Sequence, residues 1–292
     1  MALDHKYDFI MYVTVKKANP NGDPLNGNRP RIDYDGFGEI SDVCLKRKIR
    51  NRMMDLGESV FVQSNERKID NCKSLQERFE KIPSLKTESD PDRIVEIASS
   101  IWTDVRSFGQ VFAFGKNANN KKGISVGIRG PVSIHTGISE EVVEISSMQI
   151  TKSVNSVSNK KNPTIRSSDT MGNKHRVEFG TYKIVGSINP QLSEITGFNE
   201  NDVEILKKSL LTIFENDASS SRPEGSMEVS RLYWFKHKSK IGDYPASKVH
   251  KCVKLEIQDP NLKDFNRYRI VENIPNTFER NEKGDLVELN YK

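Results

Sequence analysis

Tyr7-Asp-Phe-Ile-Met-Tyr-Val-Thr-Val-Lys16 is a nearly unbroken run of β-branched and aromatic residues. Such a run predicts a strand that is buried on at least one face. It leads into Asn19-Pro-Asn-Gly-Asp-Pro-Leu-Asn-Gly-Asn-Arg-Pro30, where Asn-Gly and Pro steps predict tight turns. The chain is therefore expected to begin with a core strand followed by a turn-rich loop.

A helix is predicted over residues 41–56. Ser41 is a suitable N-cap, and Asp42 is favourable in the first turn. Apolar residues recur at positions i, i+4, i+8 and i+11 and form one stripe, made of Leu45, Ile49, Met53 and Leu56. This stripe is expected to pack on the strand.

The rest of the chain repeats the same order of elements. Strand character returns over residues 104–136 and 181–188, an amphipathic helix is predicted over 199–216, and further strands over 227–237 and 249–257. Strand, helix, strands, then strand, helix, strand is the split βαβ order of a ferredoxin-like domain. We therefore predict one α+β domain, with residues 57–103 (partly helical at 73–82 and 90–101) and the polar tract 148–180 as insertions.

Bulk composition limits the classes of protein without identifying a partner. The 292 residues carry 45 Lys+Arg against 40 Asp+Glu, a net charge of +5. The sequence has no apolar run long enough to span a bilayer and no secretory signal at its start. Three widely spaced cysteines, Cys44, Cys72 and Cys252, argue against a disulfide framework. We expect a cytoplasmic protein without a membrane partner.

The positive charge is concentrated in two places. The predicted first helix carries five cations, with like charges as helical neighbours and no interleaved acids: Lys46, Arg47, Lys48, Arg50 and Arg52. Residues 152–176 of the polar tract hold six against the single acid Asp169: Lys152, Lys160, Lys161, Arg166, Lys174 and Arg176. Both sets are suited to phosphate contacts. For the helix a solvated surface explains the pattern equally well, whereas the excess of cations in the polar tract favours phosphate contact over a solvated loop.

Most catalytic signatures are missing from the sequence. The stretch Gly109 to Lys116 lacks Walker-loop spacing, and the five histidines form no zinc motif, so no cofactor or metal is expected. Asp23, Asp33 and Asp35 lie in the loop before the basic helix, where an Asp could bind Mg²⁺ and support a metal-dependent ribonuclease. The alternative is that these carboxylates serve the turns themselves.

Several motifs together resemble the Cas-seven family of type I CRISPR–Cas systems, most closely the subtype I-C backbone subunit. They are Asn19-Pro-Asn-Gly-Asp-Pro, Gly27-Asn-Arg-Pro-Arg-Ile-Asp33 and Ile40-Ser-Asp-Val-Cys-Leu-Lys-Arg-Lys-Ile-Arg-Asn51. The similarity extends through Asp104-Val-Arg-Ser-Phe-Gly-Gln-Val-Phe-Ala-Phe114, Gly127-Ile-Arg-Gly-Pro-Val132 and Arg231-Leu-Tyr-Trp-Phe235.

The resemblance implies an RRM-like palm, a helical finger at 57–103 and a projecting thumb hairpin at 148–180. It further implies a non-catalytic subunit of a Cascade complex that stacks with copies of itself along CRISPR RNA and holds the guide for pairing with a target DNA strand. Subunits of the Cas-five and Cas-eight families would be further partners. The residues expected to contact RNA are Ser41, Lys46, Arg47, Arg50, Arg29, Arg31, Arg129, Lys160, Lys161, Arg166, Lys174 and Arg176, with Met171 as an apolar wedge near a displaced base.

Overall fold

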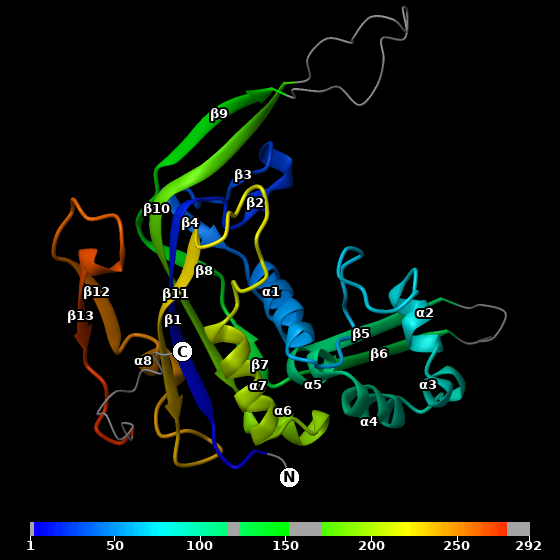
Figure 1. Cartoon of the computed structure of the whole chain (residues 1–292). Coiled ribbons are helices and arrows are strands. Elements are labelled where there is room, and N and C mark those ends of the chain that lie inside the picture. Colours follow the sequence, from blue (N-terminus) through cyan, green and yellow to red (C-terminus); the bar gives the residue numbers. More distant parts are fainter. Residues whose placement is uncertain (1–2, 116–122, 152–170, 279–292) are drawn as a thin grey trace, which may run out of the picture.

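The computed structural model describes residues 3–115, 123–151 and 171–278 (Figure 1). Its centre is an antiparallel sheet in which β1 (Tyr7–Ala18) lies between β11 (Met227–Lys236) and β10 (Met171–Ile188). Beyond β10 come β8 (Gly137–Val142) and β4 (Phe37–Ile40), while β7 (Val132–Ile134) and β9 (Ile145–Thr151) also pair with β10. The expected strand at 7–16 is confirmed, and it is buried along nearly its whole length.

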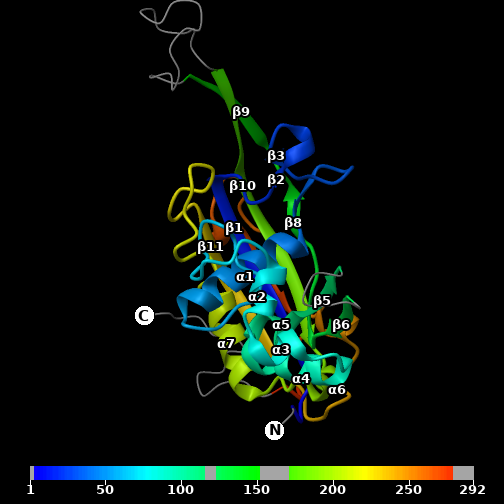
Figure 2. The same ribbon diagram turned by 90° about the vertical axis from the view of Figure 1, so that its right-hand side faces the viewer.

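One face of the sheet is covered by two helices, α1 (Asp42–Asp55) and α7 (Glu200–Leu211), which lie in front of the strands in Figure 2. The predicted stripe of α1 is buried at Leu45, Ile49 and Met53. Both helices begin where the sequence indicates: Ser41 Oγ accepts from Cys44 N, and Asn199 forms a capping box with Asp202. These caps and stripes fix both helices against β1, although α7 ends earlier than the predicted residue 216.

A helical insertion follows α1 and has a hydrophobic core of its own. Its helices are α2 (Leu75–Glu80), α3 (Pro83–Thr87), α4 (Pro91–Ile101) and α5 (Thr103–Phe108). The strands β5 (Gly109–Phe114) and β6 (Ile124–Arg129) form a separate two-stranded sheet that packs on these helices, through residues such as Phe61, Trp102 and Phe112. The expectation that strands after residue 103 belong to the main sheet is therefore wrong for β5 and β6.

The other face of the main sheet is covered by the C-terminal part of the described chain, which we call the C-terminal module (residues 246–278). It contains α8 (Ala246–Val249), β12 (Val253–Ile257), the 3₁₀ turn η2 (Phe265–Arg267) and β13 (Tyr268–Glu272). Figure 1 shows this module on the side of the sheet opposite α1 and α7. It buries aromatic side chains of the sheet completely or nearly so, namely Tyr12, Tyr233 and Phe235.

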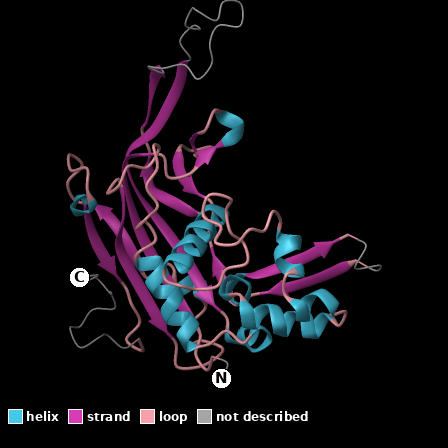
Figure 3. Ribbon diagram, turned by 45° about the vertical axis from the view of Figure 1, so that its right-hand side comes forward, coloured by secondary structure: helices cyan, strands magenta, loops and turns pink. Residues whose placement is uncertain are grey.

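A hairpin projects from the sheet and is formed by β9 and the first half of β10 (Figure 3). The pairing runs from Ile145 opposite Val177 to Thr151 opposite Met171. The sequence predicted a polar insertion followed by a separate strand at 181–188. In the structure the last part of that insertion, residues 171–180, and the predicted strand form one strand of 18 residues, so this arm of the hairpin continues a strand of the main sheet.

The remaining short elements join these parts. They are β2 (Gly22–Asp23), the 3₁₀ turn η1 (Pro24–Asn26), β3 (Arg29–Pro30) and α6 (Pro190–Thr196), a helix that the sequence analysis missed. Among the helices that the structure describes, none has both the length and the apolar character needed to cross a membrane.

Candidate nucleic-acid interface

The turn-rich loop between β1 and β4 has a defined shape because its side chains bond to backbone groups. Asn19 Nδ2 donates to Asn28 O at 2.7 Å, and Asn21 Oδ1 accepts from the backbone N of Ser41 at 2.9 Å. The thiol of Cys44 on α1 lies 3.8 Å from Pro20 O. The loop and the first turn of α1 therefore form one continuous surface.

Two arginines of this loop, Arg29 and Arg31, are predicted RNA contacts. Arg29 Nη1 donates to Ser147 Oγ of β9 at 3.2 Å, which connects the loop to the projecting hairpin. Arg31 Nη2 lies 3.4 Å from Asp23 Oδ1, and 38% of its side chain is exposed. The structure thus brings the loop, the hairpin and the start of α1 together.

The described part of the projecting hairpin carries a mixed polar surface. Arg176 pairs with Glu178 at 3.0 Å, His175 Nδ1 lies 2.7 Å from Ser147 Oγ, and Lys174 is half-exposed. Met171 is 66% exposed, with Gln149 Nε2 only 2.9 Å from its Sδ. The predicted contacts Lys160, Lys161 and Arg166 lie outside the described residues.

Most cations of α1 have an acid as a partner, which comes from the same helix for Lys46 and from distant segments for Lys48 and Arg52. Lys46 Nζ lies 3.0 Å from Asp42, the buried ammonium of Lys48 bonds to Asp217, and Arg52 pairs with Glu215 at 2.6 Å. The expectation of a helix whose charge lacks nearby acids is therefore wrong. The compensating acids come mostly from distant positions that helical spacing does not reveal.

Arg50 has a structural role in this network. Its Nε donates to Asp104 Oδ2 at 2.9 Å, and the same carboxylate accepts from the backbone N of Phe61 and Val62 at 2.7 and 3.1 Å. Asp104 is 1% exposed, so its charge depends on these donors. Arg50 thereby joins α1 to the helical insertion.

Arg47 and Lys46 remain the cations of α1 that are open to an anion. Arg47 donates to the carbonyl of Val62 at 2.9 Å, which satisfies a hydrogen bond without neutralising charge. Burial and the neighbouring charge of Arg50 lower the pKa of Arg47, so a bound anion would stabilise its charged form. Lys46 keeps 26% of its side chain exposed beside Asp42.

Arg129 lies apart from this surface. It ends β6 opposite Gly109, in the small sheet of the helical insertion, and it is exposed. Figures 1 and 2 both show β5 and β6 well separated from the projecting hairpin. If Arg129 contacts RNA, it does so from the insertion.

The loop carboxylates act in the turns. Asp23 caps η1 by accepting from Leu25 N at 3.2 Å, and Asp33 accepts from the backbone N of Asp35 and of Phe37, both at 2.9 Å. Within residues 3–115, 123–151 and 171–278, there is no group of three or more His, Cys, Asp or Glu that could hold a metal ion. The turn-forming alternative for these residues is the one that the hydrogen bonds support.

A second loop lies beside this surface, at residues 216–226 between α7 and β11, and contains none of the residues predicted to contact RNA. Ser221 O accepts from the backbone N of Asn19 at 2.9 Å, and Ser226 O accepts from that of Lys16 at 2.8 Å. Arg222 of this loop pairs with Asp217 at 3.2 Å. In the sequence this segment is rich in serine and contains a single Arg, which was a usable signal.

Comparison with known proteins identifies the family. The model of the family described as CRISPR-associated protein Cas7 matches residues 5–273. A protein of Haloferax volcanii named CRISPR-associated protein Cas7 is 25% identical over 240 residues, covering 78% of this chain and 69% of the relative. Because the family model spans nearly the whole chain, the chain belongs to the Cas7 family.

Solved structures give weaker similarity. A chain of a CRISPR RNA-guided surveillance complex, pre-nicking, aligns with a TM-score of 0.45 at 14% identity, covering 78% of this chain and 77% of that one. A chain of a Type III-B Cmr-beta complex bound to cognate target RNA gives 0.41 at 11% identity, covering 79% and 61%. The assignment to the family rests on the sequence match.

Proposed function

We propose that the chain is a non-catalytic backbone subunit of a type I-C Cascade complex, whose copies assemble along CRISPR RNA and hold it for pairing with a target DNA strand. The match to the Cas7 family over residues 5–273 carries this proposal. The main sheet with α1 and α7 would form an RRM-like palm, the helical insertion the finger and the projecting hairpin the thumb. Further copies of the chain and subunits of the Cas-five and Cas-eight families would complete the assembly.

The surface chemistry supports binding through the RNA backbone. A guide must leave its base edges free for pairing, so cations that contact phosphates suit it better than pockets that read bases. The sheet face that RRM domains use to stack bases is covered here, because Tyr12, Tyr233 and Phe235 lie under the C-terminal module. We expect the RNA to follow the loop, α1 and the hairpin.

Each predicted contact has a role in this proposal. The groups that would contact phosphates are Ser41, Lys46, Arg47, Arg29 and Arg31. The thumb would contribute Lys160, Lys161, Arg166, Lys174 and Arg176, with Met171 as the wedge, and Arg129 would act from the finger. Arg50 is assigned a positioning role, because its guanidinium is bonded to the buried Asp104.

The decisive experiment is to purify the protein from cells that express it with a CRISPR array and to sequence the RNA that accompanies it. Uniform fragments of repeat and spacer sequence are expected, and electron microscopy is expected to show regular assemblies on them. Random cellular RNA, or none, would contradict the proposal.

A ribonuclease activity is the competing function. Labelled single-stranded RNA is incubated with the protein in Mg²⁺ or in EDTA, alongside the variants Asp23→Ala and Asp33→Ala. We expect intact RNA in every arm. Cleavage that requires Mg²⁺ and disappears in either variant would overturn the non-catalytic assignment.

A further inference from the structure

A polar pocket of about 340 Å³ lies between α1, the start of the helical insertion and the loop 216–226. Its volume falls within the range of pockets that hold small ligands. Three separate segments of the chain form its walls: α1 contributes Arg47 and Asn51, the insertion contributes Ser64, and the loop contributes Ser219 and Arg222. Neither the motifs nor the charge pattern of the sequence pointed to this pocket.

The walls of the pocket carry an excess of positive charge. Four cations line it against two acids, Glu66 and Asp217. Asp217 is shared, since both Lys48 and Arg222 pair with its Oδ2. Arg47 is bonded to a carbonyl, so its charge has no carboxylate within ion-pair distance among the described residues. An anionic group would therefore be stabilised here.

Apart from Cys44 and Ala218, the neutral residues of the pocket carry hydroxyls or amides. Among the described lining residues none is aromatic, so the pocket offers no stacking surface for a base. The side-chain Oδ1 of Asn51 is buried and has no hydrogen-bond partner in the described part of the chain. The Asn51 oxygen is therefore an unused acceptor in the wall of the pocket, which a hydroxyl donor of a bound ligand would satisfy.

The pocket is continuous with the candidate interface. The loop that forms one wall bonds to Asn19 through Ser221, and Cys44 of the pocket contacts Pro20 of the turn-rich loop. An RNA strand that follows the turn-rich loop and α1 would pass its mouth.

From this combination we infer that the pocket holds one ribose-phosphate unit of the bound strand, with Arg47 and Arg222 at the phosphate and the Asn51 amide at the ribose 2′-hydroxyl. A 2′-hydroxyl both donates and accepts, so it can bond to either end of an amide, whereas deoxyribose has no such group. The pocket would thus make the protein select RNA over DNA. This inference rests on the proposed function, because it concerns how that RNA is held.

The test measures the affinity of the purified protein for labelled oligonucleotides of one sequence, made as RNA and as all-2′-deoxy strands that contain uracil. The wild type is expected to prefer RNA, and Asn51→Ala is expected to reduce that preference by about 3- to 10-fold, the effect of one hydrogen bond. Arg222→Gln is expected to weaken binding to both strands equally. The control Asn261→Ala changes an exposed asparagine of the C-terminal module and is expected to leave both the affinity and the preference for RNA unchanged.

The outcomes separate this inference from the function on which it rests. If the wild type binds no RNA, the proposed function fails. If the wild type prefers RNA and Asn51→Ala, with an unchanged thermal unfolding midpoint, keeps the full preference, the pocket assignment is wrong while the function stands. If Asn51→Ala lowers the midpoint, Asn51→Leu provides the second variant: it has nearly the size of Asn but no hydrogen-bonding group, so the same loss of the RNA preference is expected, and an unchanged preference would also overturn the assignment.

Discussion

Single residues on α1 have either a structural or a binding role, and their partners distinguish the two. Arg50 and Lys48 bond to acids that lie far away in sequence, Asp104 and Asp217. Arg47 bonds to a carbonyl, and Lys46 lies at the surface beside an acid of its own helix. Substitutions in the first pair are expected to change stability, and those in the second to change affinity.

Arg50→Gln is expected to lower the free energy of unfolding by about 3 kcal/mol, because it leaves the buried carboxylate of Asp104 without its cation. Urea denaturation at neutral pH measures the change. Arg93→Gln is the matched control: Arg93 is 57% exposed and pairs with Glu96 on the same helix, so a change of about 0.5 kcal/mol or less is expected. Equal effects of the two substitutions would contradict the role assigned to Arg50.

The double variant Lys46→Gln and Arg47→Gln is expected to weaken RNA binding to the same extent for RNAs of unrelated sequence. If each cation contacts one phosphate, the slope of log affinity against log salt concentration flattens by about 1.4, or about 0.7 per contact on a single strand. Fluorescence anisotropy over a salt series measures the slope. A loss confined to particular sequences would show that these residues read bases.

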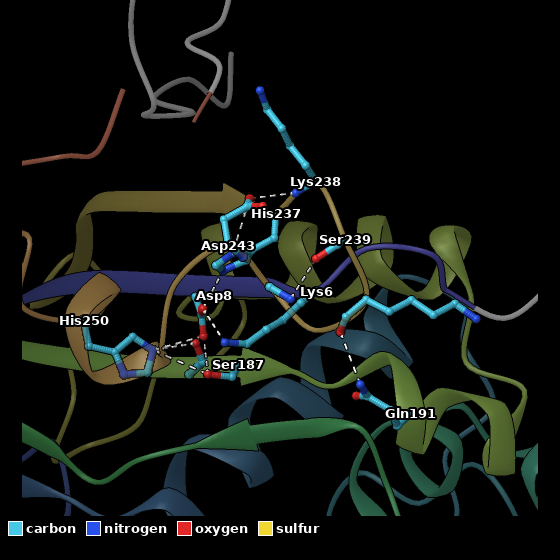
Figure 4. A network of polar contacts seen from close by, with 12 residues as sticks. Lys6, Asp8, Ser187, Gln191, His237, Lys238, Ser239, Asp243 and His250 are labelled. Atoms are coloured by element: carbon cyan, nitrogen blue, oxygen red, sulfur yellow. Dashed lines mark hydrogen bonds and ion pairs between the residues drawn. The ribbon is translucent and has the colours of Figure 1, made fainter. Parts of the chain in front are cut away.

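At the scale of elements, a buried carboxylate joins the C-terminal module to the main sheet. Asp8 of β1 is fully buried, and its carboxylate accepts a hydrogen bond from His237 Nε2 at 2.7 Å (Figure 4). Three further groups contact the same carboxylate: Lys6 Nζ at 3.1 Å, His250 Nε2 at 3.5 Å and the hydroxyl of Ser187. His237 Nδ1 in turn accepts from Asp243 N at 2.9 Å, which places its proton on Nε2. Strands β1, β10 and β11 and the end of α8 therefore meet at one carboxylate.

This cluster predicts a loss of stability in acid. Burial alone would raise the pKa of Asp8, but bonds from His237, His250 and Ser187 and the charge of Lys6 outweigh it and hold the pKa well below its usual range. Below about pH 4 Asp8 takes up a proton in the unfolded chain but not in the folded chain. The stabilisation that ionised Asp8 gives the folded state is therefore present above that pH and is lost as the pH falls.

Asp8→Asn is accordingly expected to lower the free energy of unfolding by about 3 kcal/mol at pH 7 and to reduce the dependence of stability on pH between about 5 and 3. Urea denaturation across this range, compared with wild type and with the exposed Asp35→Asn, tests both parts. An unchanged pH profile in Asp8→Asn would show that other carboxylates cause the acid sensitivity.

The projecting hairpin is expected to be dispensable for folding and required for assembly. Residues 148–151 and 171–174 belong to none of the hydrophobic clusters of the described chain. Ser147 faces His175, so replacing residues 148–174 with Asn-Gly closes the hairpin with a two-residue turn. The unfolding free energy is expected to change by about 0.5 kcal/mol or less.

On long RNA, sedimentation and electron microscopy are expected to show that the shortened protein binds without forming regular filaments. Filaments of normal regularity would contradict the role of the hairpin as a thumb.

At the scale of the whole molecule, the features that depend on local sequence patterns were predicted correctly. The strand at 7–16, the stripe and cap of α1, and the partly helical insertion are read from neighbouring residues and are confirmed. The pairing of β5 with β6 outside the main sheet, and the cover of the second sheet face by the C-terminal module, depend on contacts between distant segments. Those parts could not be predicted from periodicity.

The candidate site shows the same division. The loop motifs and the basic positions of α1 were identified, because residue types and spacing are visible in the sequence. Asp104 and Asp217 neutralise much of that charge. They lie 54 and 169 residues from their partners, so the sequence did not identify them. The pocket formed with the loop 216–226 was missed for the same reason, since its walls meet only in the folded chain.

The continuity of β10 has a mechanical consequence. Its 18 residues run without interruption from the core of the sheet to the end of the described hairpin, a length of about 60 Å at the usual rise of a strand. A hairpin attached by flexible linkers would allow neighbouring subunits to take variable distances. Here the strand that forms the arm is also a strand of the main sheet, so in an assembly each arm would keep a fixed orientation relative to the sheet of its own subunit.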